Sequence, residues 1–251
     1  MQLLLLLLAF FLTPRTRAGE IIGGHEAKAH SRPYMAYLEF RYNTSVAICG
    51  GFLIHEKFVL TAAHCLNRYS EHLETIVLLG AHNIKKQEKT QQLIRVKRSI
   101  PHPLYNRRNR TRDLMLLKLE EKANLTKEVE FIKLPNDKSQ VNPGAICLVA
   151  GWGQLTPNGS SPNTLHEVKI AVQKDKECET RFSKYDSTTE MCVGDPKIIK
   201  HSLKGDSGGP LVCNNMAQGI VSYGKKSGRP PGVYTKLSSY GDWIKKTMRH
   251  H

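Results

Sequence analysis

The residues best suited to chemistry lie in one short stretch, Lys204–Pro210, which reads KGDSGGP. Ser207 stands there between Asp206 and two glycines, an arrangement that suits a nucleophile on a tight turn. Amide N–H groups at such a turn can converge on one oxygen, so we expect the backbone N–H groups of Gly205 and Ser207 to form an oxyanion hole. Gly/Ser/Asp turns are common, and this stretch alone indicates catalysis only weakly.

Two further stretches supply the partners that a serine nucleophile needs. His64 follows an apolar run that begins at Leu60, and Asp113 stands at the head of another apolar run. The chain order His, Asp, Ser is one of the known orders of the nucleophilic triad. In that chemistry the serine attacks a carbonyl, the histidine takes and returns its proton, and the aspartate orients the imidazole. Asp206 is a rival orienting acid, but it is a direct neighbour of the nucleophile and suits that role less well.

These motifs, together with the IIGG sequence of Ile21–Gly24, resemble those of the chymotrypsin-like serine proteases. The likeness is greatest to the granzyme and mast-cell chymase branch, and it runs from Ile21 to about Met248. It implies an all-β fold of two six-stranded antiparallel β-barrels with a C-terminal α-helix and an active site between the barrels. It also implies a serine-type endopeptidase that needs no cofactor.

The pattern of the chain by itself also favours a mostly β fold, because short apolar runs bounded by Gly, Pro, Asn and Lys recur throughout. The expected strands are Met35–Phe40, Phe58–Ala63, Ile76–Gly80, Leu114–Leu119, Ile146–Gly151, Val168–Val172, Gln218–Ser222 and Gly232–Lys236. Such spacing is typical of an antiparallel sandwich or barrel. Ser239–Arg249 predicts a helix with Trp243, Ile244, Thr247 and Met248 on one face.

The chain opens with a segment typical of a secretory signal. Leu3–Leu12 is an apolar run too short to cross a bilayer, and Ala18 suits a cleavage site, so we expect residues 1–18 to be a signal peptide. No lysine or arginine precedes the run, which is unusual for such signals. No later stretch approaches the roughly 20 apolar residues of a transmembrane helix, so a soluble, secreted protein is expected.

Gly19–Glu20 separate this predicted signal from Ile21. The resemblance implies that a dipeptidyl peptidase removes the dipeptide at residues 19–20 and leaves a protease domain of residues 21–251. The new ammonium group of Ile21 would then fold inward and pair with Asp206, because a buried charge needs a partner. The same likeness implies storage in the secretory granules of immune cells.

Six cysteines follow the predicted signal, and an even number in a secreted chain favours three disulfides. The count alone allows fifteen pairings. The resemblance selects Cys49–Cys65, Cys147–Cys213 and Cys178–Cys192. A zinc site is the rival interpretation, but no two cysteines have the two-residue spacing of zinc ligands, so we expect no metal.

The resemblance also locates the pocket for the substrate residue that precedes the cut bond. It places His201 and Ser202 at the base and Ser222, Gly224 and Gly232 in the walls, and the main chain of 222–224 is expected to pair with substrate as an added strand. The base lacks the aspartate of trypsin-like members, and Gly232 replaces the arginine of aspartate-cleaving granzymes. We therefore expect cleavage after large apolar or aromatic residues. The alternative is cleavage after acidic residues, which a protonated His201 would favour.

The chain is strongly basic, with 37 Lys and Arg against 22 Asp and Glu and a formal charge of +15. Loss of Arg15, Arg17 and Glu20 with the leader leaves +14. The cations form three clusters: Lys85, Lys86 and Lys89; Arg95, Lys97 and Arg98; and Arg107, Arg108, Arg110 and Arg112. Such a surface attracts polyanions. Because no zinc finger or RNA-recognition motif is present, we expect a sulfated proteoglycan or heparin-like polymer rather than nucleic acid.

A second class of function stays open on the same observation. A relative that retains the triad but acts chiefly by binding polyanions or microbial surfaces would show the same charge. Four sequons, at Asn43, Asn109, Asn124 and Asn158, could carry glycans in a secreted protein.

Overall fold

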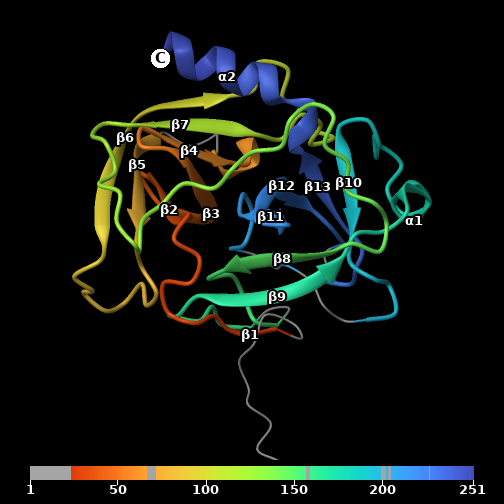
Figure 1. Ribbon diagram of the computed structural model, residues 1–251, viewed down its shortest axis with the longest axis horizontal. Coiled ribbons are helices and arrows are strands. Elements are labelled where there is room, and N and C mark those ends of the chain that lie inside the picture. The colour runs from red at the N-terminus through yellow and green to blue at the C-terminus, as the bar shows by residue number, and fades with distance from the viewer. Residues whose placement is uncertain (1–23, 67–71, 157–158, 199–201, 203–204, 226) are drawn as a thin grey trace, which may run out of the picture.

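The computed structural model describes residues 24–66, 72–156, 159–198, 202, 205–225 and 227–251. Figure 1 shows two β-structures side by side, with the C-terminal helix along one edge. The strands are β1 (His25–Glu26), β2 (Met35–Tyr42), β3 (Val46–His55), β4 (Phe58–Thr61), β5 (His72–Leu79), β6 (Gln92–Pro101), β7 (Met115–Leu119), β8 (Ile146–Gly151), β9 (His166–Ala171), β10 (Glu190–Val193), β11 (Pro210–Cys213), β12 (Met216–Tyr223) and β13 (Gly232–Lys236). The helices are α1 (Asp175–Glu179) and α2 (Gly241–His250).

The first half of the chain forms a closed barrel in the order β2-β3-β4-β7-β6-β5. Alternation along β2 sends Ala36, Leu38 and Phe40 to the interior, where all three are fully buried. Phe52 of β3 and Leu60 of β4 complete this side of the core with no exposed surface. Each such large apolar side chain contributes roughly 1.5–3 kcal/mol on burial. The packed core therefore fixes the end of β4 and the start of β7. His64 follows the first of these and Asp113 precedes the second.

The second half forms a sheet in the order β1-β9-β8-β11-β12-β13-β10. The two-residue strand β1 pairs only with β9, so six strands make up the body of this sheet. An isolated bridge joins Val172, just after β9, to Val193 at the end of β10. Main-chain bonds Gln173 N to Cys192 O and Gly194 N to Ala171 O, each 2.8 Å, flank the bridge. The sheet thereby closes on itself, and the predicted chymotrypsin-like fold of two barrels is confirmed.

All eight expected strands fall on observed ones, with small shifts of boundary. One shift matters for function: β4 ends at Thr61, and Ala63–Cys65 form a 3₁₀ turn instead of continuing the strand. The predicted helix is α2, in which Ile244 and Thr247 are buried against the first barrel. Within the described residues, no helix has the length and apolar character needed to cross a bilayer.

Five strands, β1, β3, β6, β10 and β11, lie outside the eight expected runs. Gly50 and Gly51 interrupt the apolar pattern of β3, and β6 carries exposed Arg95, Lys97 and Arg98 between its inward-facing residues. Both β10 and β11 have only four residues. Such strands form because neighbouring strands pair with them, which their own composition does not reveal.

Candidate active site

A short polar contact joins His64 to Asp113, which lie far apart in the sequence. His64 lies on the 3₁₀ turn after β4, and Asp113 lies just before β7. The His64 Nδ1 atom is 2.7 Å from Asp113 Oδ2, and the main-chain N–H of His64 donates to Oδ1 at 2.9 Å. The Asp113 side chain is fully buried, whereas that of His64 is 13% exposed. The imidazole is thus held on one side by a carboxylate and open to an incoming group on the other.

Two hydroxyl groups of the second barrel also hold Asp113. Ser222 Oγ, from β12, donates to Asp113 Oδ2 at 2.5 Å, and Thr235 Oγ1, from β13, donates to the main-chain oxygen of Asp113 at 2.9 Å. The sequence suggested Ser222 only as a pocket wall and did not suggest Thr235 at all. Their contacts join strands that lie more than a hundred residues further along the chain from Asp113, so no local pattern indicates them.

The surroundings of Asp113 keep its carboxyl group ionised. Complete burial by itself would raise its pKa, but the charge of His64 and the hydrogen bonds from His64 and Ser222 hold the pKa below its ordinary value. A permanently charged carboxylate at Nδ1 stabilises an imidazolium, which is the state a general base reaches after accepting a proton.

The Ser207 turn packs directly on the strands that lead to His64. The main-chain oxygen of Ser207 accepts a hydrogen bond from Gly50 N at 2.8 Å. Gly208 has φ +83°, and a Cβ atom there would lie 2.1 Å from Thr61 Oγ1 and 2.5 Å from Gly50 O. Only glycine fits this position, both for its backbone angle and for its space. The half-buried Ser207 is thereby brought to the end of β4, where the His64 turn begins.

The Asp206 side chain is closely surrounded by glycines, and this glycine-lined site is called the seat below. The side chain is fully buried, and its Oδ1 accepts a hydrogen bond from Gly153 N at 2.9 Å. A Cβ atom at Gly151 or Gly153 would lie 2.2 or 2.5 Å from that oxygen. Gly205, with φ +105°, approaches Gly153 equally closely, since its Cβ position is 2.7 Å from Gly153 Cα. The sequence predicted Asp206 and Gly205 but not this seat, and the predicted partner Ile21 lies outside the described residues.

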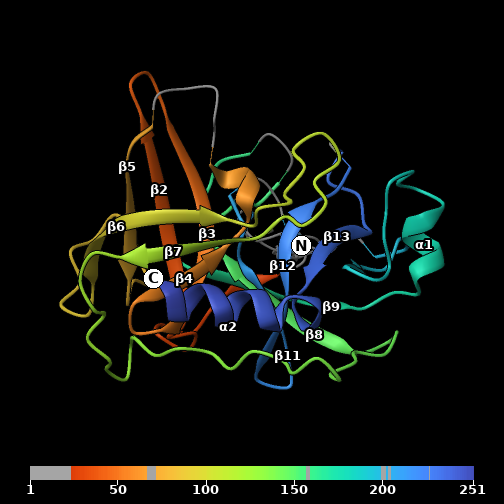
Figure 2. The same ribbon diagram turned by 90° about the horizontal axis from the view of Figure 1, so that it is seen from above.

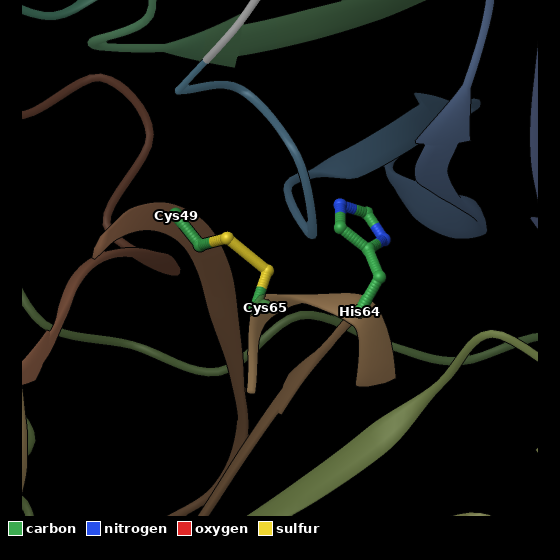
Figure 3. Close-up of side chains that lie close together, drawn as sticks. All are labelled: Cys49, His64 and Cys65. Atoms are coloured by element: carbon green, nitrogen blue, oxygen red, sulfur yellow. A yellow bond between two sulfur atoms is a disulfide. The ribbon is translucent and has the colours of Figure 1, made fainter. Parts of the chain in front are cut away.

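Three disulfides are present, and they join the pairs that the resemblance implies: Cys49–Cys65, Cys147–Cys213 and Cys178–Cys192. The first ties β3 to the 3₁₀ turn, and Figure 3 shows the His64 ring standing beside it. The two sulfur atoms and a ring nitrogen of His64 lie within 4.8 Å of one another. Sulfur atoms bonded to each other are not thiolates, so this trio is not suited to hold a metal ion.

The predicted pocket residues lie along the second barrel. Ser202 is buried, and its hydroxyl is 2.9 Å from the hydroxyl of the fully buried Tyr234. Gly232 is buried at the start of β13, and Gly224 is exposed just after β12. His201, predicted at the base, lies outside the described residues.

A buried acid behind the pocket wall was missed by the sequence analysis. Tyr223, next to Ser222, donates its hydroxyl to Glu190 Oε2 at 3.0 Å, and Asp186 N donates to the same oxygen at 3.0 Å. Burial raises the pKa of Glu190 to about 7. The Tyr223 ring also meets Phe182 edge-on, with centroids 5.5 Å apart. Tyr223 is therefore fixed at the edge of the site by contacts on two sides.

The predicted glycosylation sites differ in their surroundings. Asn43 and Asn124 are exposed. Asn109 is half-buried, and its Oδ1 accepts a hydrogen bond from the hydroxyl of Thr111 at 3.0 Å. Asn158 lies outside the described residues.

The fold and this site define a class of protein. Residues 21–244 match the trypsin family, and the chain belongs to it; it is a hydrolase of the serine-endopeptidase type that acts on proteins. The chain is 60% identical to granzyme B of Homo sapiens, with 100% of both chains covered, and 56% identical to granzyme H of Homo sapiens, with 99% of both covered. It is 53% identical to mast cell protease 3 of Ovis aries, covering 100% of this chain and 98% of that protein.

A solved structure also resembles this chain in sequence and fold. The structure titled "Structure of GrC" is 54% identical, with a TM-score of 0.87, and the match covers 92% of this chain and 100% of that one. The resemblance to the granzyme and chymase branch is thereby confirmed.

Proposed function

We propose that this chain is a secreted, granule-stored endopeptidase in which Ser207 is the nucleophile, His64 the general base and Asp113 the orienting acid. The observation that carries the proposal is the His64–Asp113 contact of 2.7 Å, formed at the end of the strand on which the Ser207 turn packs. Because Nδ1 faces Asp113, Nε2 is the nitrogen that takes the Ser207 proton. The backbone N–H groups of Gly205 and Ser207 would then stabilise the oxyanion.

Acyl transfer follows from these roles. Ser207 Oγ attacks the peptide carbonyl while His64 takes its proton, and His64 returns the proton to the leaving amine as the C–N bond breaks. Water then enters, loses a proton to His64 and attacks the acyl carbon. His64 gives that proton to Ser207 Oγ as the ester C–O bond breaks, and the free acid is released.

A fluorophosphonate label tests this role, because only an activated serine reacts with it. The mature protein should be labelled once, and Ser207→Ala should remove both the label and peptide hydrolysis. His64→Ala and the double variant should fall to similarly low rates, since the groups act as a unit. Ser139→Ala, which removes a hydroxyl bonded to Asn136, is the control and should be labelled normally. Substantial hydrolysis by Ser207→Ala would show that another group is the nucleophile.

Activation is the second part of the proposal. Residues 1–18 would be removed as a signal peptide and Gly19–Glu20 by a dipeptidyl peptidase, after which the Ile21 ammonium pairs with Asp206. The fully buried carboxylate of Asp206 supports this, because a charge in such a place is stable only with partners. Protein that begins at Gly19 should be nearly inactive, protein that begins at Ile21 active, and Asp206→Asn impaired even when trimmed. Equal turnover by the Gly19 and Ile21 forms would contradict the activation step.

For the residue before the cut bond we propose Phe, Tyr, Leu or Met. Gly232 leaves space in the wall, and the neutral Ser202 is hydrogen-bonded to Tyr234, so the described pocket residues offer no charge to an ionic side chain. A peptide library should be profiled at about pH 5.5 and about pH 8, since an acid preference through His201 would weaken as that imidazole loses its proton. Cleavage only after Asp or Glu at both values would refute the apolar preference.

A further inference from the structure

A short basic loop of residues 106–111 reaches from the first barrel to β12 (Figure 2). The loop is closed by a bridge in which Asn106 N donates to Thr111 O at 3.1 Å. Asn106 Oδ1 accepts a bond from Arg108 N at 2.9 Å, and Arg110 has a left-handed backbone with φ +56°. These local bonds hold the backbone of the loop in a turn from which its arginine side chains project.

Arg110 makes the contact that links this loop to the catalytic site. Its Nη1 atom donates to the main-chain oxygen of Ser222 at 2.8 Å, and the hydroxyl of the same Ser222 donates to Asp113. The half-buried guanidinium therefore lies at the wall on which substrate is expected to pair. A carbonyl oxygen has two lone pairs, so Ser222 can accept from Arg110 and from a substrate amide together. Among the described residues the Arg110 side chain has no other hydrogen-bond partner, so its remaining N–H groups can meet a bound peptide.

The space beside Arg110 is basic. A cavity of about 510 Å³ is lined by Arg107, Arg108, Asn109, Arg110, Arg181, Phe182, Ser183, Lys184, Tyr223 and Gly224. None of these residues is a carboxylate. Arg181 is already paired with Glu177 at 2.6 Å, whereas Arg108, Arg110 and Lys184 form no ion pair within the described part of the chain. The cavity thus carries positive charge that the described residues do not neutralise.

The direction of a bound strand decides which substrate side chains meet this charge. Successive side chains of an extended peptide point to opposite faces. If the residue before the cut bond enters the pocket of Ser202 and Gly232 in the second barrel, the side chain preceding it turns the other way, toward the loop that carries Arg110. The second and fourth residues before the cut share that face.

We propose that this basic cavity, with Arg110 as its central residue, selects acidic side chains at the second and fourth positions before the cleaved bond. The inference rests on the proposed endopeptidase function and deepens it. The guanidinium can hold a carboxylate through two parallel N–H bonds, and bound substrate would shield the pair from water.

Peptides with a fixed Phe before the cut and Asp, Gln or Lys at the second and fourth positions test the inference. The wild-type protein should cleave the Asp peptides about tenfold better than the Gln peptides, judged by kcat/KM, and the advantage should shrink at about 0.5 M salt. Arg110→Gln should remove most of the advantage, and Arg110→Glu should reverse it in favour of Lys. Arg249→Gln, which removes an exposed arginine of α2, is the matched control and should leave the preference unchanged. Fluorophosphonate titration counts the folded sites in each variant.

Four outcomes are distinct. Reversal by Arg110→Glu supports the inference, because a merely structural role of Arg110 would not favour lysine. Equal cleavage of Asp, Gln and Lys peptides overturns the inference and leaves the endopeptidase intact. Loss of heparin binding in Arg110→Gln with an unchanged peptide preference also overturns it and assigns the cavity to a polyanion. Failure to cleave any peptide, without fluorophosphonate labelling, would overturn the proposed function itself.

Discussion

The hydroxyl of Ser222 is expected to stabilise the protein through the charge of Asp113. It donates at 2.5 Å to a carboxylate that is completely buried, where water cannot replace it. A hydrogen bond to a charged group contributes roughly 1.5–3 kcal/mol. Ser222→Ala should therefore lower the free energy of unfolding by about that amount at pH 7. We also expect kcat/KM to fall about tenfold, because the carboxylate that orients His64 is less firmly held.

The pH dependence of this effect follows from the direction of the pKa shift. The folded pKa of Asp113 lies below its ordinary value, so its ionised form stabilises the fold above the unfolded pKa of about 3.9. That stabilisation is lost as the pH falls through the lower, folded pKa. The deficit of Ser222→Ala should accordingly persist from pH 7 to about pH 4 and disappear in stronger acid.

Urea unfolding with the disulfides intact, from about pH 7 down to about pH 2.5, measures the deficit. Thr235→Val is the matched control, since it removes a hydroxyl bond to the main-chain oxygen of Asp113 rather than to its carboxylate. Its deficit should be smaller, roughly 0.5–1.5 kcal/mol, and should not vary with pH. A deficit in Ser222→Ala that is negligible at pH 7, or that grows as the pH falls, would refute the reasoning.

Three further predictions can be checked by similar means. Gly208→Ala should lower the free energy of unfolding by roughly 3 kcal/mol or more and abolish hydrolysis, whereas Gly144→Ala, also at positive φ but with nothing within 4 Å of the new Cβ, should lose about 1 kcal/mol. The pKa of Glu190 is raised to about 7 in the folded protein. Its ionisation therefore opposes folding from about pH 4.5 upward, and does so fully above pH 7. Glu190→Gln should raise the free energy of unfolding at pH 8 by up to roughly 3 kcal/mol, with little change at pH 4. Heparin affinity should fall steeply with salt, and serine at the exposed Lys97 and Arg98 should weaken it without altering peptide hydrolysis; salt-independent binding would remove the electrostatic basis.

Placing Arg110 at the substrate wall changes how the basic clusters are interpreted. The sequence groups Arg107, Arg108, Arg110 and Arg112 as one polyanion-binding patch. The contact of Arg110 with the main-chain oxygen of Ser222 instead places that residue beside β12, at the proposed substrate wall. A heparin experiment that replaced Arg110 would therefore mix two effects, which is why Lys97 and Arg98 on β6 are the better choice.

The sequence by itself predicted the chemistry, because residue types and local patterns can be read directly from the chain. The KGDSGGP turn, His64, Asp113 and the recurring short apolar runs were enough to predict a triad and a two-barrel fold. Regular runs of apolar residues predict a strand, which is why β2 and β7 were expected. Where glycines or charges interrupt the run, as in β3 and β6, the pattern predicts no strand.

Only the tertiary structure decided which distant groups support that chemistry. The bond from Ser222 to Asp113, the seat of Gly151 and Gly153 around Asp206, and the contact of Arg110 with β12 all cross from one part of the fold to another. Such contacts depend on how each barrel closes and how the two meet, and closure is set by the summed burial of many apolar side chains. No single stretch of sequence carries that information, so these partners appear only when the chain is folded.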